Sequence, residues 1–161
     1  MLGSNELTGS IPSSISNATK ISLLSLGYNQ FTGSVPATLG KLHELEILHL
    51  DGNHLTAEST PAGANFLRSL ANCRRLRKLE LASNPFKLEL PILVGNLSLS
   101  LEEFNMHSCE IHGRIPNEIA NLTSLRLLKI SNNNLVGPVP GTLGRLPVVS
   151  REQPTTRINP N

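Results

Sequence analysis

Aromatic residues, charges and cysteines are all scarce in this chain. Its 161 residues include no Trp, one Tyr, four Phe and two Cys, and only 16% are charged. Since 39% are hydrophobic but 3% aromatic, the core has to be aliphatic, built from Leu and Ile. The formal net charge of +2 favours neither a nucleic acid nor an anionic membrane as a partner.

Long apolar runs are also missing. No stretch approaches the length of a membrane span, roughly 18 apolar residues or more, so we expect no membrane contact by this segment. The beginning of the chain lacks the basic start and apolar stretch of a signal peptide. Leu2 instead occupies the same repeat position as Leu26. We therefore expect the chain to begin inside a repeat, as a gene fragment, a truncated product or an engineered piece.

Sequence motifs for catalysis and metal binding are missing as well. The sequence has no Gly-rich phosphate loop, no Gly-x-Ser-x-Gly and no kinase catalytic loop. It also lacks the Cys-x-x-Cys and His-x-x-x-His spacings of metal sites. We expect no catalytic residues, no metal and no cofactor, and we predict that this chain is not an enzyme.

What the sequence does have is a regular repeat. Asn5, Asn29 and Asn53 are equally spaced, and the pattern shifts and returns at Asn84 and later at Asn133. Around each of these Asn residues stands Leu-x-Leu-x-x-Asn-x-Leu or a close variant. A fixed period of roughly 20–29 residues with this pattern is typical of a leucine-rich-repeat solenoid.

The predicted fold is an α/β, right-handed leucine-rich-repeat solenoid of about six repeats over residues 1–147. Short parallel strands should line its concave face, and 3-10 or short helical turns its convex face. After a partial first repeat, the repeats begin at Ile21, Leu45, Leu76, Leu101 and Leu125. Residues 148–161 leave the pattern and form a polar tail, which we expect to be frayed.

Each repeated Asn should turn inward and bond backbone groups that a tight turn leaves unpaired. Cys109 replaces this Asn in one repeat, and Cys73 occupies the inward position of Leu42. We expect two buried free thiols, because this register places Cys73 and Cys109 on different flanks, too far apart for a disulfide.

Two repeats depart from the common pattern. The repeat at 45–75 is longer than the others, with an insertion around 57–65. The apolar spacing that begins at Phe66 predicts a longer convex helix in this repeat. In the next repeat Leu88 stands where four of the others have Gly, which should alter one bend.

Two longer motifs carry a family resemblance. Asn-x-Leu-x-Gly-x-Ile-Pro resembles the plant-specific extracellular leucine-rich repeats, and the match covers residues 2 to 147. Residues 66–73, Phe-Leu-Arg-Ser-Leu-Ala-Asn-Cys, are followed by Asn-Leu-Ser-Leu-Ser-Leu-Glu at 96–102. That order resembles the immune-type receptor-like kinases, whose signal peptide, paired-Cys caps, membrane span and kinase domain have no counterpart in these residues.

The resemblance implies a recognition module from a receptor-like kinase ectodomain, on the extracellular side of the plasma membrane. It implies a peptide or protein ligand, a co-receptor and a role in plant defence signalling. Two alternatives remain open: a secreted inhibitor of a cell-wall-degrading enzyme, resembling the polygalacturonase inhibitors, and a truncated receptor acting as a scaffold or decoy.

Side chains that flank the two core leucines of each strand should point outward. Across the successive strands they would line a groove of roughly 20 Å. For each single position, a solvated sheet face with paired charges is the alternative, as for Lys78 beside Glu103. The ligand-binding residues we predict are Tyr28, His49, Asp51, Lys78, Glu80, Glu103, Asn105, His107 and Lys129.

Three Asn-x-Ser/Thr sequons begin at Asn17, Asn96 and Asn121. Each lies at the same offset after its repeat's Asn or Cys, so all three should fall in one convex column. Glycans there would leave the strand side open. The sequons also match the repeat's favoured residues, and we expect both interpretations to hold.

The two ends of the stack lack recognisable caps. We expect exposed apolar side chains at the first strand, from Leu2 and Leu7, and at the last, from Leu128, Ile130 and Leu135. Because each end is also an unpaired sheet edge, we predict end-to-end self-association.

Overall fold

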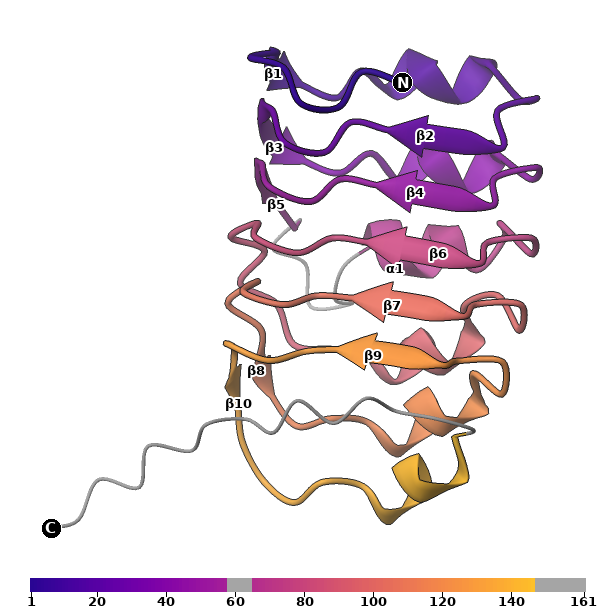
Figure 1. The fold of residues 1–161 in the computed structure, drawn as a ribbon, viewed down its shortest axis with the longest axis vertical. Helices are drawn as coiled ribbons and strands as arrows, with labels where there is room; N and C mark the ends of the chain where they lie inside the picture. Colours follow the sequence, from indigo (N-terminus) through magenta and orange to yellow (C-terminus); the bar gives the residue numbers. More distant parts are fainter. Residues whose placement is uncertain (58–64, 147–161) are drawn as a thin grey trace, which may run out of the picture.

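The repeats stack one on another along a single axis (Figure 1). The computed structural model describes residues 1–57 and 65–146. One parallel sheet runs along the stack in the order β2-β4-β6-β7-β9. Its strands are β2 (Leu23–Ser25), β4 (Ile47–His49), β6 (Lys78–Glu80), β7 (Glu103–Asn105) and β9 (Leu127–Lys129). The predicted solenoid and its strand positions are confirmed.

Short helical turns run along the opposite side. Five are 3-10 helices: η1 (Ser13–Asn17), η2 (Ala37–Lys41), η3 (Ile92–Asn96), η4 (Asn117–Asn121) and η5 (Gly141–Arg145). Each begins directly after a Pro, whose fixed φ suits the entry to a helical turn and whose missing N–H costs nothing there. The long repeat carries α1 (Asn65–Leu70), as its spacing predicted. Residues 58–64 of its insertion, and the tail, lie outside the described residues.

A second set of strands, which the sequence analysis missed, follows the recurring turn of most repeats. It forms two separate parallel sheets, in the orders β1-β3-β5 and β10-β8. Their strands are β1 (Thr8–Ser10), β3 (Gln30–Ser34), β5 (His54–Thr56), β8 (His112–Gly113) and β10 (Asn134–Leu135). Between the two sheets, the repeat with Leu88 contributes only an isolated bridge from Glu89 to His112. Leu88 is buried there, and the sheet is interrupted at the repeat in which Leu88 replaces Gly.

The repeated Asn residues form a buried ladder of hydrogen bonds. Asn84 Nδ2 donates to the carbonyls of Leu50, Leu81 and Ala82, at 3.0, 2.9 and 3.2 Å. Its Oδ1 accepts from the Leu55 amide at 3.0 Å. Asn133 likewise bonds its own turn and the preceding repeat, including the Met106 carbonyl at 2.8 Å. Asn29, Asn53, Asn84 and Asn133 thus each join two repeats and satisfy polar groups that the turns leave unpaired, whereas Asn5 bonds only its own turn.

Both cysteines are free and fully buried, as predicted. In the Asn ladder, the Cys109 thiol donates weakly to the Leu81 carbonyl, with sulfur and oxygen 3.3 Å apart. The core is mainly aliphatic, and it also contains all four Phe. Phe66 of α1 stacks on Phe86 of the next repeat with ring centroids 5.4 Å apart, which ties the long repeat to its neighbour.

The apolar side chains expected to be exposed at the two ends behave differently. At the amino end Leu2 and Leu7 are exposed, as predicted. At the other end the prediction was wrong, because Leu128 is only 5% exposed. Ile130 and Leu135 are partly buried and pack against the core.

The reason for this difference is that the chain continues beyond β9 into η5. Leu143 of this last turn packs against the core, and Leu146, directly after the turn, is buried in it. Apolar exposure at this end falls instead on Val136 and Val139.

Candidate ligand-binding face

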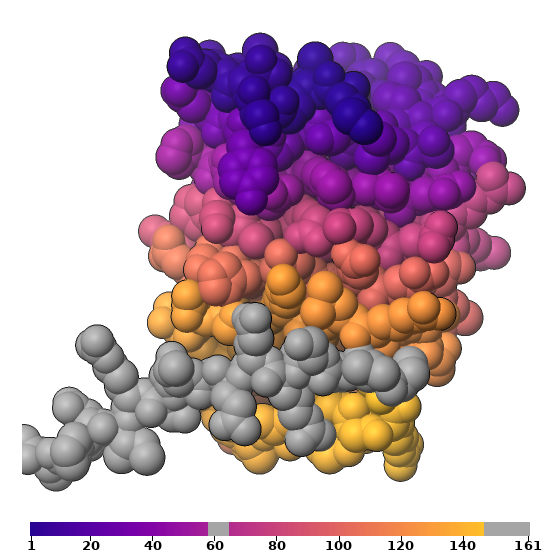
Figure 2. Space-filling model, viewed as in Figure 1, coloured from indigo at the N-terminus to yellow at the C-terminus, as the bar shows by residue number. Residues whose placement is uncertain are grey.

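The sheet β2-β4-β6-β7-β9 presents regular columns of outward side chains, which we call the strand face. In every strand the middle residue is buried and its two neighbours are partly exposed. Figure 2 shows this side as a broad surface crossed by successive bands, one repeat beside the next. Backbone pairing aligns one column as Ser25, His49, Glu80, Asn105 and Lys129, and another as Leu23, Ile47, Lys78, Glu103 and Leu127. Both columns match the sequence-based alignment.

The centre of the strand face is a network of paired charges. Lys78 Nζ lies 2.8 Å from Glu103 Oε2 and 3.5 Å from Glu80 Oε1. Asn105 Nδ2 donates to Glu80 Oε2 at 2.7 Å, and Asn105 Oδ1 accepts from the His107 amide at 3.0 Å. The hydrogen bond that Lys78 donates to Glu103 is the largest cause of the raised pKa of Lys78. These five predicted residues therefore form one preorganised cluster, in which each charge has an opposite partner.

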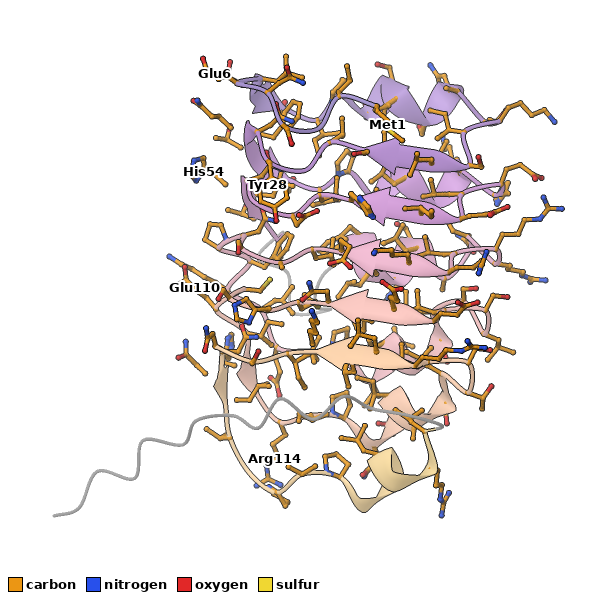
Figure 3. All side chains as sticks on the ribbon, viewed as in Figure 1. Met1, Glu6, Tyr28, His54, Glu110 and Arg114 are labelled. Carbon is orange, nitrogen blue, oxygen red and sulfur yellow. The ribbon has the colours of Figure 1, made fainter. Side chains whose placement is uncertain are left out.

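Tyr28 stands apart from this cluster, beyond the carboxyl ends of β2 and β4 (Figure 3). It is 66% exposed, and its φ of 53° lies in the left-handed region that bulky residues rarely adopt. A Cβ at Gly52 would come within 2.8 Å of the Tyr28 ring, so this Gly leaves the space that the ring uses. The charge of Asp51, followed by its hydrogen bond, raises the pKa of the Tyr28 hydroxyl.

Two predicted residues have no partner for their polar side-chain atoms. His49 Nε2 is a buried nitrogen without a hydrogen bond among the described residues. No ion pair or side-chain hydrogen bond involves Lys129 within residues 1–57 and 65–146. The Lys129 ammonium therefore remains available beside the paired centre, whereas the unpaired nitrogen of His49 is covered.

The structure thus divides the nine predicted residues into a central network, a Tyr28–Asp51 pair and two unpaired side chains. It adds Ser131, whose Oγ lies 2.8 Å from His107 Nδ1. The unusual backbone of Tyr28 was also missed. The position before each ladder residue has a positive φ throughout, and its other occupants are small or turn-forming residues: Ser4, Gly52, Ser83, Ser108 and Asn132. A single bulky Tyr in that column was a readable signal of a special site.

The three sequon Asn residues occupy equivalent sites, as predicted. Asn17, Asn96 and Asn121 are the last residues of η1, η3 and η4, and all are exposed. The described residues contain no group of three or more His, Cys, Asp or Glu placed to hold a metal ion. None of the described helices has the length and apolar character needed to cross a membrane.

Comparisons with known proteins agree with this geometry. Two models described as leucine rich repeat match residues 1–55, and 100–122 with 124–146. The ectodomain of the Arabidopsis receptor kinase SOBIR1 is 30% identical, with a TM-score of 0.73, and the match covers 87% of this chain and 72% of that one. The chain belongs to the leucine-rich-repeat family.

Its relatives are plant receptor kinases. A protein of Arabidopsis thaliana named as a leucine-rich repeat receptor-like serine/threonine-protein kinase is 50% identical over 127 residues. That match covers 78% of this chain and 13% of the relative, so the chain spans about an eighth of its length. The Arabidopsis receptor kinase HAESA, solved in complex with the peptide hormone IDA and the co-receptor SERK1, is 33% identical with a TM-score of 0.81. The match covers 92% of this chain and 24% of HAESA.

Proposed function

We propose that this chain is part of a plant receptor ectodomain and that its strand face binds a peptide or protein ligand. The observation that carries the proposal is Tyr28, an exposed aromatic ring held over Gly52 at a left-handed position that the other repeats fill with smaller residues. Such strain occurs preferentially where a side chain serves a function rather than stability. The peptide complex of HAESA, a structurally similar receptor, supports the same assignment.

The distribution of charge suggests how a ligand would be held. Lys78 pairs with both Glu80 and Glu103, so these charges are held in place and the centre of the face keeps a small excess of negative charge. Tyr28 at one side and Lys129 at the other remain available for a partner's polar and charged groups. Because binding energy concentrates in a few anchors, we expect Tyr28, His49 and Lys129 to contribute most.

An extended ligand would cross several strands, so its binding should depend on more than one repeat. A specific interface buries about 800 Å² on each partner. Because the chain spans about an eighth of its relative, it should hold part of such a footprint and bind weakly.

A peptide selected from a displayed random library against the folded chain provides a probe for this face. Alanine variants of His49, Glu80 and Lys129 should each weaken binding of the probe in calorimetry. Alanine variants of Lys41 and Arg145, which lie on the convex side, serve as matched controls. Loss of binding confined to the convex variants would place the ligand on the other side of the solenoid.

The same proposal includes glycans at Asn17, Asn96 and Asn121 and an extracellular location in the parent protein. All three Asn side chains are exposed on the helical-turn side, away from the strand face. Secretion of the chain from plant cells behind an added signal peptide should yield three glycans. Replacing each Asn by Gln should remove one glycan mass in mass spectrometry, and an unmodified wild-type chain would refute this part.

The two alternatives make different predictions for the same chain. A cell-wall-enzyme inhibitor would bind a polygalacturonase through the strand face and reduce its activity. A truncated scaffold or decoy would bind a full-length receptor laterally. Neither alternative is favoured by the comparisons, because the similar proteins described above are receptor kinases.

A further inference from the structure

A second polar site lies on the flank of the solenoid, where the convex turns lead into the strands. It is a hollow of ≈ 340 Å³ lined by His43, Asn72, Arg74 and Arg75, which we call the flank pocket. These residues follow η2 and α1, so two successive repeats build it. Nitrogen-tipped side chains project from this edge at the level of β4 and β6, on the right in Figure 3.

The flank pocket keeps an excess of positive charge, unlike the centre of the strand face. Arg75 pairs with Glu44, and the neighbouring Arg77 pairs with Glu102 at 3.2 Å. The guanidinium of Arg74 has no ion pair or side-chain hydrogen bond in the described part of the chain. The backbone of Arg74 is bonded, because its amide donates to the Asn72 carbonyl at 3.0 Å and its carbonyl accepts from Ser98 Oγ at 2.7 Å. A planar guanidinium with free donors is suited to bidentate binding of an oxyanion.

If the sequons at Asn17, Asn96 and Asn121 carry the proposed glycans, these glycans leave this part of the flank uncovered. Asn17 and Asn96 stand on the repeats before and after the pocket. On the two repeats that build it, the equivalent positions are Lys41 and Asn72, and neither begins a sequon. Glycans at the sequons would therefore frame an unglycosylated window around Arg74.

We propose that the flank pocket binds a carboxylate of an acidic segment in a protein partner, at a surface separate from the strand face. Its volume is at the low end for ligand pockets, which suits one or two acidic side chains. An acidic polysaccharide suits it less. Such a chain needs a continuous row of cations along the axis, and Glu44 and Ser100 interrupt the row that contains Arg75.

The test uses the full chain and a fluorescently labelled decaglutamate peptide, with binding followed by fluorescence anisotropy. Arg74→Gln removes the free charge and keeps a polar side chain, and Arg145→Gln is the matched control, exposed at the end of η5. Losing a charged bidentate contact should weaken binding about tenfold in R74Q, and the control should change it less than about twofold. Amide resonances of His43 and Arg75 should shift on titration. Circular dichroism checks that both variants are folded.

Several results would overturn the inference. Equal weakening by R74Q and R145Q would show only general charge attraction, and inorganic phosphate competing as well as the peptide would show an adventitious ion only. Tighter binding of oligogalacturonate would assign the pocket to polysaccharide. Weakening by Lys129→Ala but not by R74Q would move the acidic peptide to the strand face, refuting the flank pocket while leaving the proposed function intact. If strand-face variants left binding of the library peptide unchanged while R74Q abolished binding of decaglutamate, the proposed function would be refuted and the flank pocket would stand.

Discussion

Asn84 is the most buried member of the Asn ladder, and its replacement by Ala gives the sharpest test of how the repeats are held together. Its side chain is 1% exposed and makes four hydrogen bonds to backbone groups of three segments. Ala removes all four bonds while keeping the backbone unhindered. The consequences differ from one bonded group to the next.

The Leu55 amide loses the Asn84 oxygen, and the Leu81 carbonyl keeps only the weak Cys109 thiol. The Leu50 carbonyl retains its bond from Asn53, and the Ala82 carbonyl retains the Gly52 amide at 2.9 Å. Two buried groups are thus left poorly satisfied, each at about 1–3 kcal/mol, so we expect a loss of about 3 kcal/mol. For a chain of this size, that corresponds to a melting temperature lower by roughly 6–12 °C.

Thermal unfolding followed by circular dichroism measures the change, and two further ladder residues calibrate it. Asn5 is exposed at the amino end, so Asn5→Ala should cost about 0.5 kcal/mol or less. Asn133 is half-buried, and Asn133→Ala should fall between the two. An Asn84 variant that melts with the wild type, or equal losses for Asn5 and Asn84, would refute the ladder as the link between repeats.

Three further predictions concern the thiols and the ends. Neither cysteine should react with a thiol reagent in the folded chain at neutral pH, and both should react after denaturation; reaction of the native protein would contradict their burial. Burial raises the pKa of Cys73 to about 11 and that of Cys109 to about 12. Both values exceed the pKa of ~8.5 that a thiol has in the unfolded chain. The contribution of the thiols to the free energy of unfolding should therefore be complete below pH ~8.5 and fall as the pH rises above it. Urea titrations at several pH values measure this free energy, and a value that does not fall with pH would contradict the prediction. At the ends, the chain should self-associate with concentration in sedimentation, and Leu7→Lys with Val136→Lys should suppress this; a monomeric wild type at high concentration would refute end-to-end contact.

The central strands and their alignment could be predicted because one repeat constrains the next. Leu48 and Leu79 occupy the same inward position, so aligning them also aligns His49 with Glu80 on the outer face. The second set of strands could not be predicted in this way. It depends on the turn after each ladder Asn bringing short polar segments side by side, and these segments have no apolar alternation of their own.

The candidate site was predictable only as a set of positions. The columns follow from strand alternation, so most of the predicted residues needed only the repeat alignment. The Lys78–Glu103 pair also followed from the alignment, but the additional contact of Lys78 with Glu80 did not, because one Lys between two Glu residues can bond either or both. In the structure Lys78 contacts both, at 2.8 Å to Glu103 and 3.5 Å to Glu80. Two features of Tyr28 could not be predicted from its neighbours in the sequence. These are its left-handed backbone and the space that Gly52 of the next repeat leaves for its ring.

The sequence by itself determined that this protein is a stack of leucine-rich repeats with an Asn ladder, because the period places every core residue relative to the next. It also determined the positions of the strand face and the sequons. Only the tertiary structure decided which charges on that face cancel and which remain free. It alone brought His43 and Arg74, which belong to different repeats, into one pocket. Outward side chains carry little of the folding energy, so their contacts depend on the space between neighbouring repeats rather than on the repeat pattern.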